Sequence, residues 1–242
     1  MKLLFAGTSH GVPEADRFCS SIFVQLGEKT YIVDAGAPIS SRLRHYGIPH
    51  HSVQGIFVTH LHGDHFNGLT EFCDLITWYF KDTDPQILLP EERGVQLLET
   101  WTYTILPIPP EQRKPLRCAV YTPGVIYDDG TLRVTARPTR HTAHSNAFLL
   151  EAEGKRVLIT GDMSRNYPEY PDLLNGEAYD LVICEAAHHE CYADLAPMFA
   201  AAHTKRMIVT HINPVKLDGI ERLRPHLPFA YDLAYDGMTV EL

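Results

Sequence analysis

The feature that most constrains this chain is a seven-residue stretch, THLHGDH, at residues 59–65. It follows the apolar run GIFV at residues 55–58, and a short apolar run that ends in polar residues is typical of a buried strand. His60 and His62 are two residues apart, so on an extended backbone both imidazoles point to the same side. The end of this strand therefore presents two histidines in one direction.

The second half of the stretch faces a different direction. Gly63 permits the chain to turn, and Asp64 and His65 follow immediately after it. Imidazole and carboxylate groups are ligands of divalent transition metals, and here they occur as two pairs that are separated by a turn. This arrangement predicts two metal ions side by side, whereas the alternative interpretation is a surface loop that happens to be rich in histidine.

A His-x-His-x-Asp-His pattern at a strand end resembles the metallo-β-lactamase superfamily of metal-dependent hydrolases. The remaining ligands of that family arrive in a fixed order, and this chain offers a matching residue for each of them. They are His141 ahead of the strand-like residues 147–151, Asp162 in a Thr-Gly-Asp sequence after an apolar run, and His211 in a Thr-His sequence. By this resemblance, one metal is bound by His60, His62 and His141, the other is bound by Asp64, His65 and His211, and both are bridged by Asp162.

Two further residues are assigned through the same resemblance. Asp34 ends an apolar run and is followed by Ala35-Gly36, and in the family such a strand end places an aspartate beneath the metal-binding histidines. Its carboxylate would orient a ligating imidazole, because such a ring usually donates its second N–H to a group of this kind. The alternative is an aspartate in a turn or a helix cap.

His144 competes with His141 for the ligand role, but the family places its ligand several residues before the strand, which favours His141. His144 then lines the pocket or is an ordinary loop histidine.

The stretch DLVICEAAHH at residues 180–189 follows the pattern of RNase Z enzymes and of the cyclic-phosphate phosphodiesterases of phosphonate breakdown. In those relatives a strand ends in an acidic residue, and a later histidine serves in catalysis. The resemblance implies that His189 is the catalytic acid with Glu185 as its partner and His188 in reserve. It also implies that Asp64 orients the nucleophile as well as binding metal. The alternative is a pair of adjacent surface histidines.

The resemblance as a whole implies a dinuclear metal-dependent hydrolase, and the expected activity is that of a phosphodiesterase on a small or cyclic phosphate ester. Two metal ions would share a water whose pKa is lowered towards about 7, and the hydroxide would attack phosphorus. Imidazole with few carboxylates suits Zn(II), although Mn(II) and Fe(II) also occupy mixed N/O sites. The alternatives are a lactone or thioester hydrolase on the same metals, a ribonuclease Z-like nuclease, and a non-catalytic metal-binding homologue.

The net charge of the chain, and two family segments that it lacks, limit which substrates and partners are expected. The formal net charge of −9 argues against a general nucleic-acid surface, because non-specific affinity comes mainly from Lys and Arg at phosphates. An anionic small-molecule substrate is still expected, because bound cations make the site itself positive.

The Cys-rich insertion of the phosphonate enzymes is missing between Val12 and Cys19, which argues against identity with them. The long basic arm of RNase Z has no counterpart either, which argues against tRNA processing. Arg137 and Arg140 are the candidate pocket cations.

Cysteine usage and proline content give two further expectations. The five cysteines form no C-x-x-C pair, which fits reduced thiols in a cytoplasmic protein, and no apolar run is long enough for a membrane span. The Pro-dense residues 106–115 exclude helix and central strand. They are expected to form a stiff loop, which is a surface connector, a lid or a contact in a homodimer.

The remaining pattern predicts one domain over residues 1–242. Strands are expected at residues 2–6, 20–26, 30–33, 55–58, 86–89, 132–138, 147–151, 156–160, 181–184, 207–210, 230–233 and 238–242. Helices are expected at residues 37–46, 67–80, 91–103, 169–174, 194–202 and 217–223. Two runs of strands, each followed by helices, suit an α+β fold of two mixed β-sheets packed face to face with helices outside. This agrees with the four-layer αββα sandwich that the resemblance implies.

Overall fold

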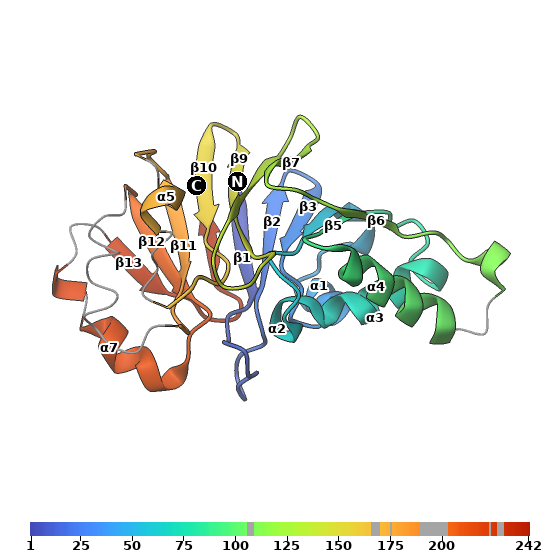
Figure 1. Ribbon diagram of the computed structural model, residues 1–242, viewed down its shortest axis with the longest axis horizontal. Helices are drawn as coiled ribbons and strands as arrows, with labels where there is room; N and C mark the ends of the chain where they lie inside the picture. The colour runs from blue at the N-terminus through green and yellow to red at the C-terminus, as the bar shows by residue number, and fades with distance from the viewer. Residues whose placement is uncertain (106–108, 166–169, 175, 189–202, 223, 227–229) are drawn as a thin grey trace.

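The computed structural model describes residues 1–105, 109–165, 170–174, 176–188, 203–222, 224–226 and 230–242. Within these residues, the strands form two seven-stranded sheets that lie face to face (Figure 1). The first sheet has the order β14-β1-β2-β3-β4-β5-β6, and the second has the order β13-β12-β11-β10-β9-β8-β7.

The elements have the following bounds. The first sheet contains β1 (Lys2–Gly7), β2 (Ser21–Leu26), β3 (Lys29–Val33), β4 (Val53–Phe57), β5 (Gln86–Leu89), β6 (Arg117–Val120) and β14 (Thr239–Glu241). The second contains β7 (Gly124–Asp128), β8 (Arg133–Pro138), β9 (Asn146–Ala152), β10 (Lys155–Ile159), β11 (Leu181–Glu185), β12 (Arg206–Thr210) and β13 (Ala230–Leu233). The described α-helices are α1 (Ile39–His45), α2 (Gly63–Phe66), α3 (Gly68–Trp78), α4 (Glu92–Ile105), α5 (Tyr170–Leu174) and α7 (Leu217–Glu221). Short 3-10 helices are η1 (His50–Ser52), η2 (Pro110–Gln112), η3 (Pro214–Lys216) and η4 (Arg224–His226).

Both sheets are mixed, and their parallel parts decide where a site can form. In the first sheet β3, β4, β5 and β6 are parallel, whereas β1 pairs antiparallel with β2 and β14. In the second, β10, β11, β12 and β13 are parallel, whereas β7 to β10 form an antiparallel run. Because the carboxyl ends of parallel strands meet at one edge of a sheet, the loops that follow them converge.

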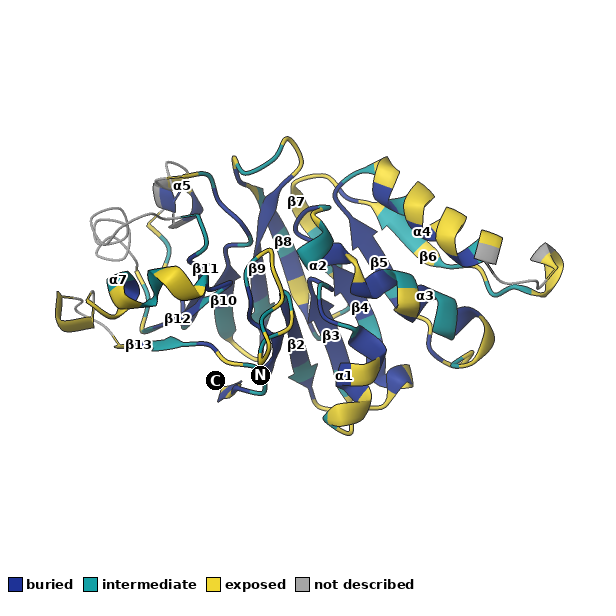
Figure 2. Cartoon of the chain, turned by 90° about the horizontal axis from the view of Figure 1, so that it is seen from below, coloured by how far each residue is buried: buried dark blue, intermediate teal, exposed yellow. Residues whose placement is uncertain are grey.

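Three apolar clusters correspond to the three contacts between four layers. Phe57 and Phe148 belong to the cluster between the two sheets, and both are fully buried. Phe72 of α3 belongs to a cluster that joins the first sheet to its helices, and Ile220 of α7 belongs to one that joins the second sheet to its helices. Figure 2 shows the same division, because the strands are largely buried and the helices expose one face. The predicted αββα sandwich of two mixed sheets is therefore confirmed.

Two strands were missed in the prediction from sequence. β6 and β7 are the edge strands of their sheets and are half-exposed, so neither shows the alternation or the apolar run that marks a buried strand. The predicted helix at residues 194–202 lies outside the described residues, as does part of the Pro-dense loop. None of the helices in the described part of the chain combines the length and the apolar character that a membrane span requires. A single domain over residues 1–242 stays a prediction.

One buried histidine outside the strand-end cluster gives a testable pH dependence. The His50 ring stacks on Phe80 with 3.7 Å between the ring centroids, and its Nε2 is buried without a hydrogen-bond partner among the described residues. Burial lowers the pKa of His50 below its usual value, and the charge of Arg44 lowers it further. The unfolded chain therefore binds the proton more tightly than the folded chain does, so acid favours unfolding.

We expect the contribution of His50 to the free energy of unfolding of the metal-free protein to fall as the pH drops below about 6.5, the ordinary histidine pKa. The His50→Phe variant keeps the stacked ring and should lose less stability than the wild type over this window. Urea unfolding on both sides of the window measures the difference. His51→Gln is the matched control, because the side chain of His51 is 63% exposed. Equal pH dependence in His50→Phe and the wild type would contradict this expectation.

Candidate metal centre

The seven residues predicted as metal ligands all follow strand ends at one end of the sandwich. The first sheet supplies four of them and the second sheet supplies three. After β4 come His60, His62, Asp64 and His65, after β8 comes His141, after β10 comes Asp162, and after β12 comes His211. The structure therefore brings together residues that are up to about 150 positions apart in the chain.

The local backbone at these strand ends is unusual in a way that sets side-chain direction. Asp34 and His211 adopt positive φ angles of 57° and 52°, and Gly161, which precedes Asp162, has a φ of 57°. For a residue with a Cβ atom this conformation costs roughly 1–3 kcal/mol and persists only where the surroundings enforce it. Strained backbone of this kind occurs often at functional sites, and here it lies next to the convergent polar side chains.

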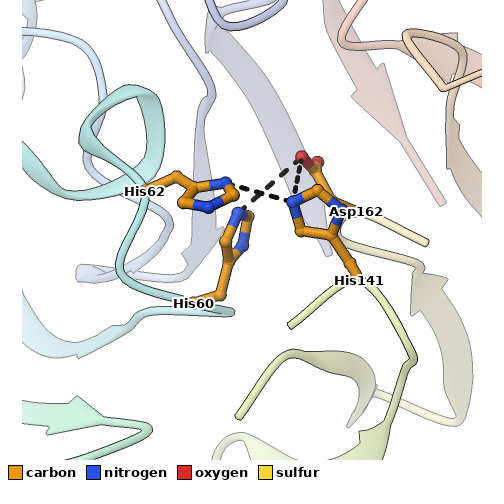
Figure 3. Close-up of side chains that lie close together, drawn as sticks. All are labelled: His60, His62, His141 and Asp162. Carbon is orange, nitrogen blue, oxygen red and sulfur yellow. Dashed lines mark hydrogen bonds and ion pairs between the residues drawn. The ribbon is translucent and has the colours of Figure 1, made fainter. Parts of the chain in front are cut away.

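The first group contains His60, His62, His141 and Asp162 (Figure 3). The Nε2 atoms of His60 and His141 lie 3.7 and 3.5 Å from Asp162 Oδ2. His141 Nε2 also lies 3.0 Å from His62 Nδ1. Each residue offers one ligand atom, and these atoms lie within 4.8 Å of one another. Four donor atoms at this spacing can surround one divalent cation.

The second group contains Asp64, His65, His211 and the same Asp162. His65 Nε2 lies 3.3 Å from both Asp64 Oδ2 and Asp162 Oδ1. His211 Nε2 lies 3.0 Å from Asp64 Oδ2 and 3.6 Å from Asp162 Oδ1. Asp162 thus turns one carboxylate oxygen towards each group, which is the position that a bridging ligand requires.

The chemistry of the donor atoms fits divalent cations. His60 Nε2 and Asp162 Oδ1 are buried and have no hydrogen-bond partner among the described residues, although unpaired buried polar atoms are costly. Burial lowers the pKa of His60 to about 2, and the neighbouring His65 lowers it further, so this ring stays neutral and keeps a lone pair. Burial alone would raise the pKa of Asp162, but His211 and His65 hold it well below its usual range. A neutral imidazole and an ionised carboxylate are the forms that bind metal.

Two residues beneath the cluster fix the tautomers of its histidines. Asp34 accepts a hydrogen bond from His65 Nδ1 at 2.7 Å and another from the backbone N–H of Thr59 at 2.7 Å. The Thr59 hydroxyl donates to Asp34 and lies 3.1 Å from His60 Nδ1, so it accepts the Nδ1–H of that ring. In the neutral form that binds metal, both rings would therefore present an unprotonated Nε2 to the cluster. The predicted orienting position of Asp34 agrees with this geometry. Thr59 was missed, although its place directly before His60 is a usable signal.

Of the two candidate proton donors, the structure describes only His188. His189 lies outside the described residues, so its role stays a prediction. His188, its reserve, lies at the site: its Nδ1 donates to Glu185 Oε1 at 2.9 Å, and its Nε2 lies 3.9 Å from Asp162 Oδ2. Burial alone would lower the pKa of His188, but the hydrogen bond and the charge of Glu185 raise it. Lys216 Nζ donates to the carbonyl of Ala187 at 2.8 Å and so holds this turn beside the cluster.

Three residues with open assignments are placed by the structure. His144 is exposed, and its backbone N–H is bonded to Thr142, whereas His141 points into the first group. The geometry therefore favours His141 over His144. Arg137 was a candidate pocket cation, but it forms an ion pair with Glu177 and donates to the Leu173 carbonyl, which ties it to the α5 side of the second sheet. Arg140 is exposed.

Solved structures show which fold this chain has. The metallo-β-lactamase fold protein YhfI from Bacillus subtilis has a TM-score of 0.81 and 18% identity, with 100% of this chain and 99% of that chain covered. The short form of human tRNase Z has a TM-score of 0.76 and 21% identity over 100% and 99% of the two chains. A diphosphatase from the PhnP family has a TM-score of 0.72 and 17% identity over 100% and 97%. The chain has the metallo-β-lactamase fold and carries His/Asp clusters that are capable of binding metals.

Comparison with known sequences shows the family to which the chain belongs and its relatives. The sequence profile described as "Anti-Pycsar protein Apyc1" matches residues 1–225, so the chain belongs to this family. Ribonuclease Z from Anoxybacillus flavithermus is 29% identical over 190 residues, which are 75% of this chain and 59% of the relative. Ribonuclease Z from Geobacillus kaustophilus is 32% identical over 152 residues, which are 61% of this chain and 48% of the relative. The chain thus spans about half of these relatives, and the predicted resemblance to the RNase Z-like branch is confirmed.

Proposed function

We propose that this protein is a two-metal hydrolase and that it acts as a phosphodiesterase on a small or cyclic phosphate ester. The observation that carries the proposal is the position of Asp162, whose two carboxylate oxygens face two separate groups of ligand atoms. In the proposed assignment, one ion is held by His60, His62 and His141, the other is held by Asp64, His65 and His211, and Asp162 contacts both. Phosphodiester hydrolysis is a reaction for which paired cations are suited, because they clamp the attacking and leaving oxygens.

Zn(II) is the proposed metal. The ligand set contains five imidazoles and two carboxylates, and imidazole-rich sites favour Zn(II) among the available divalent ions. Mn(II) and Fe(II) accept the same mixed N/O set and are the alternatives. Measuring the metal content of protein that is purified without added metal, followed by titration of metal-free protein with each ion, distinguishes them.

The protein side chains have defined tasks in this reaction. When bound, the two cations would supply an acidified water and neutralise charge on the phosphoryl oxygens. Asp64 holds its carboxylate 3.0 Å from His211 and would orient the attacking water. His188 would donate a proton to the departing alkoxide from Nε2, while Glu185 accepts its Nδ1–H and keeps the ring in place. The small-molecule substrate is anionic in this proposal, and a homodimer remains its proposed assembly.

A substrate panel tests the proposed function. Metal-reconstituted protein is offered bis-p-nitrophenyl phosphate and 2′,3′-cyclic nucleotides beside a lactone and a thioester. Hydrolysis of the phosphodiesters, which is lost when the metals are removed by chelation and regained on their return, is the expected result. If the protein opens only the lactone or the thioester, the proposed substrate class is wrong. If it binds metal and hydrolyses none of the four, it is a metal-binding homologue without this activity.

Replacing His188 tests the proposed proton donor. We expect His188→Ala to lower kcat by about 10²–10⁴-fold on a substrate with an alkoxide leaving group, because that group needs a proton as it departs. The loss on bis-p-nitrophenyl phosphate should be much smaller, because p-nitrophenolate leaves without protonation. His144→Ala is the matched control on a nearby exposed loop, and His189→Ala is assayed beside it. Equal losses of His188→Ala on both substrates would contradict the assignment, and a selective loss in His189→Ala alone would move the role to that residue.

Ribonuclease activity is the second candidate, and the names of the sequence relatives favour it. The net charge of −9 weighs against it, because a basic surface normally carries RNA affinity. Cleavage of a 3′-extended precursor tRNA, measured beside the cyclic nucleotides at the same enzyme concentration, separates the two functions.

A further inference from the structure

A small cavity lies between the two sheets directly beneath the metal centre. Its volume is about 20 Å³, and Ser21, Asp162, Glu185 and His211 are among the residues that line it. Ser21 begins β2 in the first sheet, whereas the other three follow or end strands of the second sheet. The cavity therefore lies where the two sheets meet. This volume is the space that the centre of a water-sized sphere can occupy, and about 10–15 Å³ of such space is enough to hold one water molecule.

Besides Asp162 Oδ1, which faces the second group of ligand atoms, two polar atoms of the lining residues have no hydrogen-bond partner among the described residues. Ser21 Oγ and His211 Nδ1 are both buried and make no hydrogen bond to any described residue. The two residues are 0% and 3% exposed, and both atoms are buried away from bulk water. Buried polar groups that lack a protein partner are commonly satisfied by an internal water. The pair thus supplies a donor and an acceptor at one cavity of suitable size.

His211 differs in this respect from the other buried histidines of the cluster. In His65 and His60 the Nδ1 atom, which points away from the cluster, has a partner: Nδ1 of His65 donates to Asp34, and Nδ1 of His60 contacts the Thr59 hydroxyl. In His211 the Nε2 atom faces Asp64 and Asp162. Its Nδ1 atom therefore lies on the side away from the cluster. Its ring also extends from a backbone with a φ of 52°, a strained conformation. A histidine that ligates metal usually has its second N–H held, so the missing partner needs an explanation.

We propose that one buried water occupies this cavity, accepts the Nδ1–H of His211 and donates to Ser21 Oγ. This makes Ser21 a positioning residue of the metal centre, although it contacts neither metal nor substrate. Through the water, Ser21 in the first sheet fixes the tautomer and the ring orientation of a ligand from the second sheet. The inference rests on the proposed function only in that His211 is taken as a metal ligand.

The experiment compares three variants of the metal-free, full-length chain. Ser21→Ala removes the hydroxyl, and Ser21→Val in addition fills the cavity with a methyl group. Ser40→Ala is the matched control. Ser40 Oγ is also buried with no hydrogen-bond partner in the part of the chain that the structure describes, but Ser40 lies in α1 and does not line the cavity. Zn(II) is titrated against a competing chelator, and the affinities for the first and second ion are measured separately.

We expect both Ser21 variants to weaken the affinity for one of the two ions by about 10–100-fold, the usual effect of removing the support of a metal-bound histidine. Ser40→Ala should match the wild type. The Ser21→Val protein should unfold in urea no more easily than the wild type when metal-free, because an apolar group fills the cavity and an unpaired hydroxyl is removed. A merely structural role of Ser21 would instead change stability and metal affinity together.

Two further readouts make the outcome decisive. In Co(II)-loaded protein, the solvent-exchangeable proton NMR signal of the His211 N–H should shift or broaden in the Ser21 variants and not in Ser40→Ala. A high-resolution crystal structure of the wild type should show an ordered water between His211 and Ser21. Two ions bound with unchanged affinity in both Ser21 variants would overturn this inference and leave the proposed function standing. A wild type that takes up no metal would overturn both.

Discussion

Replacing Asp162 with alanine is expected to produce the largest loss of function of any single change in this chain. Asp162 has one carboxylate oxygen 3.7 Å from His60 and the other 3.3 Å from His65, so its removal takes a ligand from both proposed ions at once. Turnover should fall by about a thousandfold or more, because charge stabilisation by the metals is worth several kcal/mol. Elemental analysis of the purified variant should show fewer than two ions per chain.

The controls for this change separate metal loss from misfolding. Asp172→Ala alters an exposed carboxylate in α5 and should keep the wild-type metal content and activity. Asp162→Asn retains one acceptor oxygen and should hold at most one ion tightly. Circular dichroism of all three proteins checks that the fold persists. An Asp162→Ala protein that binds two ions with wild-type affinity would end the two-metal proposal.

The second large effect is expected from Gly36→Ala. A Cβ atom on Gly36 would lie 1.7 Å from the carbonyl oxygen of Asp64 and 2.4 Å from its carbonyl carbon. The obstacle is backbone, and it cannot rotate away. The neighbouring Ala35 is bonded through its N–H to the His65 carbonyl at 2.7 Å, which ties the two turns together. The substitution therefore displaces Asp64 and His65, and we expect it to cost about 3 kcal/mol of unfolding free energy.

Gly11→Ala is the matched control for this prediction. Its Cβ atom would also approach Asp64, but at an ordinary contact distance of 3.8 Å from Oδ2. Its effect on unfolding should stay within about 0.5 kcal/mol. Urea unfolding of the metal-free proteins measures both changes, and metal titration then shows whether Gly36→Ala weakens binding beyond its effect on stability. Wild-type unfolding and metal content in Gly36→Ala would show that the turn adjusts at little cost.

Much of the fold and the convergence of the site residues could be predicted from sequence, for a physical reason. A buried strand is recognisable as a short apolar run, and a polar residue directly after it must lie at the sheet edge. Asp162 and His211 follow such runs in the second sheet, so their convergence follows from its parallel strand order. His60 follows such a run in the first sheet and joins them because the two sheets pack face to face. That these residues bind metal is a prediction that the titrations above test.

Other features could not be read from sequence, because they depend on tertiary packing. The edge strands β6 and β7 are half-exposed, so their residues carry little pattern. Whether His188 or His189 faces the cluster depends on the turn that follows β11, and two adjacent histidines look alike in sequence. The role of Thr59 depends on its hydroxyl reaching Asp34, which requires two strands to be in register.

The origin of the ligand atoms in both sheets has a consequence beyond chemistry. Four of the seven side chains follow β4 of the first sheet, and three follow strands of the second. Cations held by both sets would therefore cross-link the two halves of the sandwich, and an ion that binds only the folded state stabilises it in proportion to the logarithm of its free concentration. The supply of metal in the cell would then govern how long the chain resists proteolysis as well as whether it turns over substrate.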